Sequence, residues 1–532
     1  MSIAGQRPVR RLGALILLLA AVSLGAMALA PPAGAADITV ACDGDTTGTT
    51  FTLTADCATT EPLTVPDGFT IDGAGFTISA TDAGGPQWNG AIVTNAGSSM
   101  NIQNVTIMGP ANGFQLCTNA GNVLYGIWFN GASGTVDNVI VDHIWQQQNN
   151  AFPSCQTGRA IRADSGGATR TVDITATTVR DYQKSGFEAR AGVTMSVAAG
   201  SVAGPPHPLE GLIAQNGVTF VGVTSGRVEN STIHGSSDQA PGPPPCPLPP
   251  APGACNPSNG TGVLLFGASG VTVTRNTFTG LGTDIGVAVS AGSTGNTISF
   301  NRVARNPSDN PDNTDATGIG IWVNSAAEVP SSATLICNTF DGWRSDRNIV
   351  GALQIDCTPL PAGTECERYS AHTPDVQGGP EAAGRATSPR PLLRPAEPVT
   401  WTLEAGDLPP GLELATGGAI TGTLPRNSAG TYQFTVRATD ATDLTATTEL
   451  SIRVAPGCAP APSPSSTAEP GTGPDNQPSS LVPTAVAAGD PGPARDATGS
   501  ADDSGGWWWL TVAGAAALTA LGLARRLRNH GN

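Results

Sequence analysis

Residues 262–278 read GVLLFGASGVTVTRNTF, and residues 286–303 repeat the arrangement as GVAVSAGSTGNTISFNRV. Each stretch opens with a glycine and a short alternation of apolar residues, and it closes with a hexamer that contains asparagine. Short alternating runs bounded by Gly, Asn and Ser are typical of strands and not of helices. The two stretches therefore predict a unit of short strands that the chain builds repeatedly.

The hexamer opens with an apolar residue, carries Asn or a small residue at its third or fourth place, and closes with an apolar residue. Its eight copies begin at Ile102, Val136, Ile174, Val197, Val228, Val273, Ile298 and Leu335. Subtraction gives spacings of 34, 38, 23, 31, 45, 25 and 37 residues. A short minimum spacing, lengthened by loops at one corner, is typical of a solenoid of stacked coils. We therefore predict an all-β solenoid.

The repeat resembles the right-handed parallel β-helix of the pectate-lyase-like superfamily over about Ile38–Cys357. We assign residues 36–370 to this domain, because the alternative, a conventional β-sandwich, would not need one repeated motif. The resemblance implies that Asn276, Asn301 and Asn338 point inward and form a ladder of side-chain amides from coil to coil.

The strands that follow a glycine predict which side chains face the core. Alternation places Val263, Leu265, Val287 and Val289 inward, so Val287→Asp should be costly and the outward change Ala288→Asp nearly silent. The expected outward column comprises Trp128, Arg162, Glu188, Thr219, Leu264, Ala288 and Trp322. Trp128 and Trp322 are the candidate ligand-binding residues, because an exposed indole can stack on a sugar ring; packing beneath a loop is the alternative.

The densest charge in the chain surrounds three candidate catalytic residues, Lys184, Glu188 and Arg190. In the superfamily that the repeat resembles, lyases use a Lys or Arg base beside acidic groups, and hydrolases use clustered carboxylates. However, the sequence lacks the paired aspartates and Gly-His-Gly of polygalacturonases, and no histidine recurs at metal-ligand spacing. We therefore favour binding over turnover.

These charged residues can instead stabilise the fold through ion pairs between consecutive coils, and we prefer this interpretation to a catalytic one. Aligning consecutive coils places Arg162 beside Glu188 and Asp164 beside Arg190. Neighbouring parallel strands lie about 4.8 Å apart, so these residues would form two exposed ion pairs, each contributing at most about 1 kcal/mol.

A second module follows a proline-rich joint at 371–398. Residues 408–423 read LPPGLELATGGAITGT, and residues 430–440 read GTYQFTVRATD. This pattern closely resembles the Ig-like, cadherin-like domain repeated in bacterial surface proteins, so we assign residues 399–455 to a small Ig-like β-sandwich. The alternating residues Tyr432, Phe434, Val436 and Ala438 predict the inward face of one of its strands.

Two groups of aspartates are candidate calcium ligands. Asp309, Asp312 and Asp315 recur every third residue in an Asn-rich loop, and calcium favours such oxygen-rich loops. A solvated turn is the alternative there. Asp440 and Asp443 are the candidates in the second module, because cadherin-type calcium sites use acidic residues at domain junctions.

Ten cysteines without a CxxC motif, in a chain that we expect to be exported, predict disulfides and not a metal cluster or a redox dithiol. Local spacing suggests the pairs Cys42–Cys57, Cys117–Cys155 and Cys246–Cys255. The sequence leaves open how the remaining four pair, namely Cys337, Cys357, Cys366 and Cys458.

Both ends of the chain carry targeting signals. Arginines, an apolar run and Ala33-Gly34-Ala35 predict a cleaved signal peptide over residues 1–35, for Sec or twin-arginine export. Residues 507–524 open with three tryptophans and precede a basic cytoplasmic tail at 525–532, so they predict one transmembrane helix with the body outside the cell. Residues 456–506 are rich in Pro, Ser and Gly and predict a disordered spacer. Cell-wall attachment is the alternative to the membrane anchor.

Charge narrows the class of partner. The chain has 26 Lys and Arg against 42 Asp and Glu, a net charge of −16, which argues against nucleic-acid binding. We expect an exported surface protein that acts in adhesion or glycan binding, with a polysaccharide or another surface protein as its partner and no required cofactor. A surface polysaccharide lyase or glycoside hydrolase is the alternative, and a structural envelope protein is a second one.

Overall fold

The computed structural model describes residues 36–81, 88–114, 123–146, 157–205, 215–235, 260–281, 285–305, 319–325, 329–342, 348–380 and 394–458. The chain divides into two compact units, Met1–Ser201 with Phe220–Gly226 and Val202–Thr219 with Arg227–Asn532. The predicted signal peptide, transmembrane helix and basic tail lie outside the described residues, as does nearly all of the predicted spacer. Among the residues that are described, no helix is long and apolar enough to cross a bilayer.

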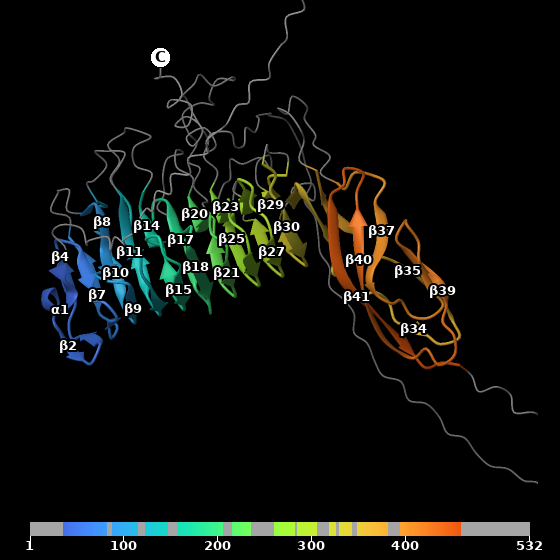
Figure 1. Ribbon diagram of the computed structural model, residues 1–532, viewed down its shortest axis with the longest axis horizontal. Helices are drawn as coiled ribbons and strands as arrows, with labels where there is room; N and C mark the ends of the chain where they lie inside the picture. The colour runs from blue at the N-terminus through green and yellow to red at the C-terminus, as the bar shows by residue number, and fades with distance from the viewer. Residues whose placement is uncertain are drawn as a thin grey trace, which may run out of the picture. The chain divides into compact units, whose positions relative to one another are not determined.

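Three long sheets hold 11, 10 and 11 strands, and successive strands of each sheet come from successive coils of the chain (Figure 1). The first sheet comprises β1 (Ala36–Asp37), β5 (Leu63–Val65), β8 (Gly90–Asn95), β11 (Leu124–Asn130), β14 (Arg159–Asp164), β17 (Ser185–Arg190), β20 (Asn216–Val221), β23 (Thr261–Phe266), β26 (Ile285–Ser290), β29 (Ile319–Val323) and β32 (Ile349–Val350).

The second and third sheets repeat this order. The second comprises β4 (Cys57–Thr59), β7 (Thr77–Ala80), β10 (Thr106–Met108), β13 (Ile140–Asp142), β16 (Thr178–Val179), β19 (Val202–Ala203), β22 (Thr232–His234), β25 (Thr277–Leu281), β28 (Arg302–Arg305) and β31 (Thr339–Asp341). The third comprises β2 (Gly44–Thr47), β3 (Thr50–Leu53), β6 (Thr70–Asp72), β9 (Ser99–Gln103), β12 (Ser133–Asp137), β15 (Arg170–Thr175), β18 (Val193–Ala198), β21 (Gly226–Glu229), β24 (Val271–Thr274), β27 (Asn296–Ser299) and β30 (Ala333–Ile336).

Strand direction confirms the predicted parallel β-helix. Within the units, neighbouring strands of the three sheets pair in parallel, as β10–β13 and β23–β26 do, apart from the antiparallel hairpin β2–β3. The N-terminal coil begins with the short helix α1 (Ile38–Ala41), whose first turn is capped by the Asp37 side chain. The predicted disulfide Cys42–Cys57 closes this coil and is confirmed.

The predicted inward residues of β23 and β26 are confirmed, because Val263, Leu265, Val287 and Val289 are fully buried. The expectation that Ala288→Asp is nearly silent is wrong. Ala288 faces outward, but it is only 1% exposed. It is covered within a second hydrophobic cluster on the outer side of the first sheet.

The glycine that recurs near the start of these strands has a packing reason. A Cβ atom on Gly262 would lie 2.6 Å from the Phe278 ring and 2.7 Å from the Gly286 carbonyl oxygen, closer than atoms approach without moving. Glycine therefore lets the first sheet come close to inward side chains of the second sheet. The alternation is interrupted near this glycine, since Ile285 and Ala288 both contribute to the outer cluster while Val287 between them faces the core.

The amide ladder is present. Asn276 Nδ2 donates to Asn301 Oδ1 at 3.0 Å, and Asn301 Nδ2 donates to Asn338 Oδ1 at 2.9 Å. Asn338 Nδ2 extends the ladder by donating to Gln354 Oε1 at 2.8 Å. All four side chains are buried, so each must find its partner in the next coil. Gln354 was not predicted because it comes from β33 (Ala352–Ile355), outside the hexamer pattern.

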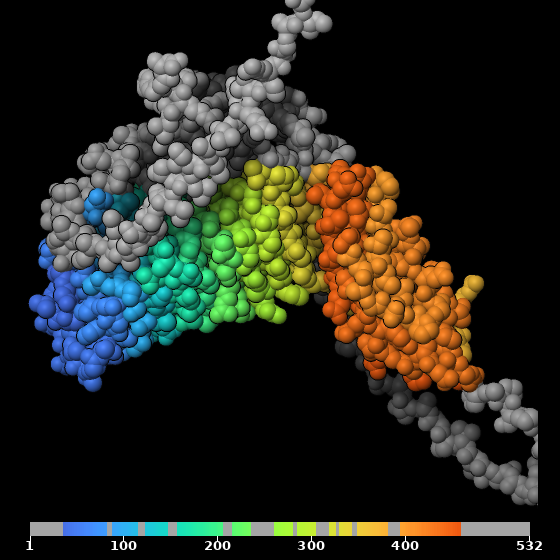
Figure 2. All heavy atoms as spheres, in the orientation of Figure 1, coloured from blue at the N-terminus to red at the C-terminus, as the bar shows by residue number. Residues whose placement is uncertain are grey.

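The C-terminal β domain has its own packed core. One sheet has the order β34 (Gly363–Thr364), β41 (Thr445–Ala455), β40 (Gly430–Thr439) and β37 (Thr400–Gly406), and the other has the order β35 (Arg368–His372), β39 (Ala419–Thr423) and β38 (Leu412–Leu414). β33 pairs antiparallel with β36 (Val376–Gly379) in a separate two-stranded sheet. β40 and β41 lie side by side in Figure 1, and their side chains form part of the orange surface in Figure 2.

Burial supports the inward face predicted for β40. Phe434, Val436 and Ala438 are buried, and the half-buried Tyr432 packs against them and donates its hydroxyl to the Ser428 carbonyl. The strands of this domain begin at Gly363, upstream of the assigned range 399–455.

Disulfides resolve the pairing that the sequence left open. Cys366–Cys458 ties the start of the C-terminal domain to its end, and Cys337–Cys357 links β30's turn to the segment after β33. The predicted pairs Cys117–Cys155 and Cys246–Cys255 lie outside the described residues.

Candidate functional site

Glu188 is the centre of a network of charges on the outer face of β14 and β17. The predicted register of Arg162 beside Glu188 is confirmed. Arg162 NH1 lies 2.9 Å from Glu188 Oε1, Arg159 Nε lies 2.5 Å from Oε2, and Arg190 Nε lies 2.7 Å from Oε1. The Glu188 side chain is 3% exposed, so three guanidinium groups compensate one buried carboxylate.

Asp164 extends the network toward β11. Arg162 donates to both carboxylate oxygens of Asp164, from Nε at 2.8 Å and from NH2 at 2.7 Å. Trp128 Nε1 donates to Asp164 Oδ2 at 2.8 Å, and the Trp128 ring packs 5.1 Å from that of Tyr125. The Arg162 guanidinium also lies 5.3 Å from the Tyr125 ring centre. Aromatic and charged side chains therefore hold one another in fixed positions.

Of the two predicted ion pairs, Arg162 with Glu188 is confirmed, and Asp164 with Arg190 is wrong. Asp164 bonds to Arg162 on its own strand, and Arg190 bonds to Glu188 on its own strand, instead of to each other. The expected exposure of the first pair is also wrong, because the side chains of Arg162 and Glu188 are 14% and 3% exposed. The preference for a structural role therefore rested in part on a wrong pairing, although the three candidate catalytic residues do belong to one cluster.

Burial and charge shift the protonation of this cluster, called here the charged network (Arg159, Arg162, Asp164, Lys184, Glu188 and Arg190). Burial alone would raise the pKa of Glu188, but the guanidinium groups of Arg159, Arg162 and Arg190 lower it below its usual value. Burial lowers the pKa of Lys184 to about 8, with Arg159 and Arg190 adding to the effect and Glu188 opposing it. Within the part of the chain that the structure describes, the charged network thus gathers four cationic side chains around two carboxylates.

Two members of this site were missed by sequence reasoning. Arg159 and Tyr125 are register partners on β14 and β11, in a second outward column beside that of Trp128 and Arg162. Strict alternation assigned one outward residue to each strand and overlooked the residue three positions before it, which is Tyr125 on β11 and Arg159 on β14. The repeated glycine, Gly126 in β11, was the available signal.

The two predicted sugar-stacking tryptophans have different surroundings. Trp128 is half-buried beside the charged network. Trp322 is 7% exposed and belongs to what we call the outer apolar cluster: Leu264, Ile285, Ala288, Ile319, Trp322 and Val350. Trp322 packs in this cluster and is not presented to a ligand, so only Trp128 remains a candidate.

The described residues give no support to the calcium candidates. Asp309, Asp312 and Asp315 lie outside them. Asp440 is buried and uses Oδ1 to accept hydrogen bonds from the backbone of Thr442 and Leu444, and Oδ2 to accept one from Ala396. Asp443 is exposed in the same turn. These contacts give Asp440 a structural role in shaping the turn.

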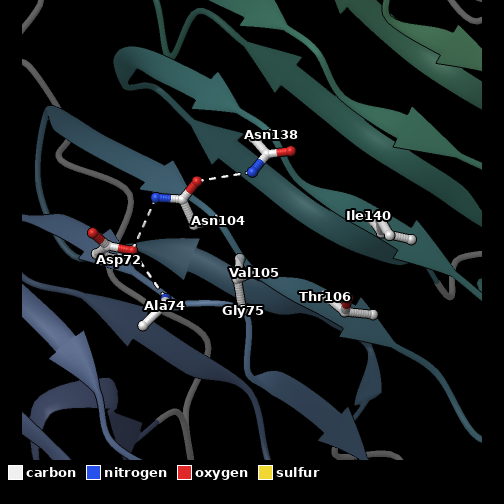
Figure 3. A pocket seen from close by; sticks show the side chains of 8 residues that line it. All are labelled: Asp72, Ala74, Gly75, Asn104, Val105, Thr106, Asn138 and Ile140. Carbon is white, nitrogen blue, oxygen red and sulfur yellow. Dashed lines mark hydrogen bonds between the residues drawn. The ribbon is translucent and has the colours of Figure 1, made fainter.

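An open groove of about 510 Å³ lies elsewhere on the first unit (Figure 3). Asn138 Nδ2 donates to Asn104 Oδ1 at 2.9 Å, and Asn104 Nδ2 donates to Asp72 Oδ1 at 3.1 Å. Although burial opposes it, hydrogen bonds from Ala74, Gln103 and Asn104 lower the pKa of Asp72. These groups largely satisfy one another, so the groove offers less to a polar ligand than the charged network does.

The C-terminal end of the second unit contains another pocket, of about 540 Å³, lined by Asp356, Asp375, Glu397 and Trp401 among others. Burial and the nearby charge of Asp375 raise the pKa of Asp356, while a hydrogen bond from Gln377 opposes the shift. Arg394 and His372 also line this pocket, so its charges are mixed, with carboxylates in excess.

Comparison with known proteins supports the fold of the second module. Residues 373–455 match the family model described as "Putative Ig domain". No curated protein sequence matches the chain.

Three solved structures show weak likeness. The enzymatically active domain of tailspike protein 2 from bacteriophage CBA120 is 11% identical over 76% of this chain, with a TM-score of 0.33. The full-length tailspike protein 2 from the Escherichia coli O157:H7 bacteriophage CAB120 is 10% identical over 76%, with a TM-score of 0.30. An endo-fucoidan hydrolase of glycoside hydrolase family 107 is 20% identical over 23%, with a TM-score of 0.16. This chain spans 66%, 59% and 16% of those chains, less than two thirds of each.

Proposed function

We propose that this parallel β-helix protein binds an anionic glycan on the outer face of β11, β14 and β17. The observation that carries the proposal is the gathering of cations: among the described residues, three arginines and Lys184 lie around Glu188, in a chain whose net charge is −16. An acidic chain has no general reason to gather cations at one place. A carboxylate or sulfate group on the ligand would pair with these cations.

The accessible part of the network suggests how such a ligand would be held. The Arg190 side chain is 35% exposed, whereas its partner Glu188 is buried, so part of the Arg190 guanidinium faces solvent while its Nε is fixed. A fixed guanidinium loses little entropy when it binds a second anion. The half-buried Trp128 ring, held by Asp164, offers an apolar surface on the same face.

Hydrolysis is the less suitable activity for this site. A hydrolase needs a carboxylic acid with a raised pKa to protonate the leaving group. Here three guanidinium groups lower the pKa of Glu188 and occupy both of its oxygens. Asp164 likewise accepts hydrogen bonds at both oxygens from Arg162. Neither carboxylate is arranged as a proton donor.

A polysaccharide lyase is the second candidate, and one observation favours it. A lyase needs a base that removes a proton next to a uronate carboxylate, and a base works best when its pKa lies near the operating pH. The pKa of Lys184, lowered to about 8, meets that condition, and the nearby arginines would stabilise the carboxylate. Lys184 would be the base in this case.

The cellular setting of the proposal comes from the sequence alone. A cleaved leader at 1–35 and an anchor at 507–524 would present the β-helix and the Ig-like domain outside the cell. Glycan binding there would serve adhesion. The binding itself requires no cofactor, and calcium bound by Asp309, Asp312 and Asp315 would be a separate property.

The test is to incubate the full-length chain with polygalacturonate, a sulfated polysaccharide and neutral dextran. We expect retention of at least one anionic polymer, no retention of dextran, and neither unsaturated products nor new reducing ends. Unsaturated products that vanish in Lys184→Met would establish the lyase instead. Equal retention of all three polymers, or of none, would overturn the proposal.

A further inference from the structure

A second cluster of titratable side chains lies apart from the charged network, in the turns that follow β13 and β16. These strands pair in register, Ile140 with Thr178 and Val141 with Val179. The backbone N–H of Ile144 donates to the Asp181 carbonyl at 3.0 Å, which continues the alignment through the turns. His143 and Asp181 therefore occupy equivalent positions in consecutive coils.

The backbone holds both residues in the same unusual conformation. His143 has a φ of 60° and Asp181 has a φ of 51°, in the left-handed region that residues other than glycine adopt rarely. Asparagine and aspartate adopt it more readily than histidine does. Histidine is also among the residues enriched in this region, and Arg275 and Phe300 adopt it at other turns of the solenoid, so the turn alone accounts for the backbone here.

The side chains converge on one another. His143 Nε2 lies 3.7 Å from Asp181 Oδ2, and His143 Nδ1 lies 2.9 Å from Asp142 Oδ1. His143 Nδ1 is buried and makes no hydrogen bond, although it lies close to Asp142 Oδ1, which accepts the His143 backbone N–H. One ring nitrogen and one oxygen from each carboxylate all lie within 4.8 Å of one another.

We propose that Asp142, His143 and Asp181 bind a divalent transition metal of the zinc class. Zinc lies about 2.0–2.2 Å from imidazole nitrogen and carboxylate oxygen, so two of its ligand atoms can be at most about 4.4 Å apart. The candidate ligand atoms all lie within 4.8 Å of one another, so a small movement of the side chains lets them share one ion. Calcium is the less suitable ion, because it takes six to eight oxygen ligands and does not favour imidazole. Water would complete the coordination.

Arg180 would compete with a bound metal ion for the Asp142 carboxylate. Its Nε lies 2.7 Å from Asp142 Oδ2, while its side chain is 55% exposed and can move into solvent. Without a metal, Arg180 compensates the buried Asp142 carboxylate, whose side chain is only 5% exposed. Metal binding would take over part of this compensation, so Arg180 should weaken the affinity for the metal.

The experiment is calorimetric titration of chelator-treated full-length chain with Zn²⁺. Asparagine tolerates positive φ, so His143→Asn and Asp181→Asn remove a ligand while keeping the turn. We expect each change to weaken Zn²⁺ binding by at least about tenfold, and Arg180→Gln to strengthen it. His234→Asn, which removes a histidine elsewhere, should bind Zn²⁺ as the unaltered chain does.

A second readout does not depend on binding heat. Zn²⁺ should raise the melting temperature of the unaltered chain and of His234→Asn, because a ligand that binds only the folded state stabilises it. Zn²⁺ should not raise the melting temperature of Asp181→Asn. If circular dichroism shows that His143→Asn does not fold, the result for Asp181→Asn alone tests the proposal. Unchanged Zn²⁺ affinity in both ligand variants, or no binding by the unaltered chain up to about 1 mM, would overturn the proposal.

Discussion

The outer face of the first sheet carries opposite chemistry in two regions with the same backbone. Register places Trp128, Arg162 and Glu188 in one column of the first unit, and Leu264, Ala288 and Trp322 in the matching column of the second. The column beside it holds Tyr125 and Arg159 in one unit and Ile285 and Ile319 in the other. The coil thus fixes where outward side chains stand and leaves their chemistry free.

The two regions are stable for different physical reasons. The outer apolar cluster is stabilised by removing apolar surface from water, about 25 cal/mol for each Å². Removing charged groups from water is instead costly, so the charged network depends on ion pairs and hydrogen bonds that compensate each buried charge. A polar ligand can therefore add to the charged network, whereas it has nothing to bind in the apolar cluster.

The largest effect that we expect comes from unbalancing the charged network. Glu188→Gln keeps the shape but leaves three guanidinium groups without their shared anion. We expect a loss of about 4 kcal/mol in the free energy of unfolding, as when one partner of a buried pair is removed. Urea denaturation measures it, and Glu229→Gln, whose carboxylate pairs with Arg227 nearer the surface, is the control with little effect. A Glu188→Gln chain as stable as the control would show that the network is not a buried one.

A charge placed in the apolar region should be nearly as damaging. Ala288→Asp buries a carboxyl group among Ile285, Ile319 and Trp322, and it should cost about 3 kcal/mol of unfolding free energy. Thr297→Asp, on a half-buried outward position of the third sheet, should cost much less. Equal melting temperatures for the two variants would mean that the outer face of β26 is open to water.

Replacing the charged side chain of Lys184 by an apolar one should raise the free energy of unfolding, whereas the two changes above lower it. The pKa of Lys184 is about 8 in the folded chain against 10.5 as its ordinary value, so protonating Lys184 disfavours folding below pH 8. Lys184→Met should therefore be more stable than the unaltered chain by about 2 kcal/mol at pH 7. The gap should narrow as pH rises from 8 to 10.5, where the unaltered chain gains stability. A gap independent of pH would contradict a lowered pKa.

The smallest expected effect concerns two charges that the sequence paired and the structure separates. Double-mutant cycles with alanine should give a coupling of at most about 0.3 kcal/mol between Asp164 and Arg190, because neither is the other's hydrogen-bond partner. The cycle between Glu188 and Arg190 should give about 1 kcal/mol or more. A larger coupling between Asp164 and Arg190 than between Glu188 and Arg190 would contradict the structure and support the pairing predicted from the sequence.

The sequence predicts the solenoid well because coils repeat locally readable features. Glycine at the start of a strand, alternating valines and the inward asparagines each leave a pattern in one dimension, and the ladder Asn276, Asn301 and Asn338 was found in this way. The Ig-like module was recognised from its own short motif.

The candidate sites were less predictable, because they depend on contacts between coils. Alternation alone cannot show that the residue three positions before the outward Arg162 also faces outward, so Arg159 escaped notice. It cannot show burial either, so Trp128 and Trp322 looked alike although only one lies beside the network. The cluster at His143 and Asp181 brings together residues 38 positions apart (181 minus 143) through coil register, and no local spacing reveals it.

The measurement that tests the central claim most directly is calorimetric titration of polygalacturonate into the full-length chain and three variants. Arg190→Gln and Trp128→Ala alter the charged face, whereas Arg302→Gln removes an exposed arginine that pairs with Asp341 on the second unit. We predict binding that weakens with added salt, falls at least about tenfold in the first two variants, and is unchanged in the third. Equal losses in all three variants would mean non-specific attraction of a polyanion, and they would contradict a binding site on β11, β14 and β17.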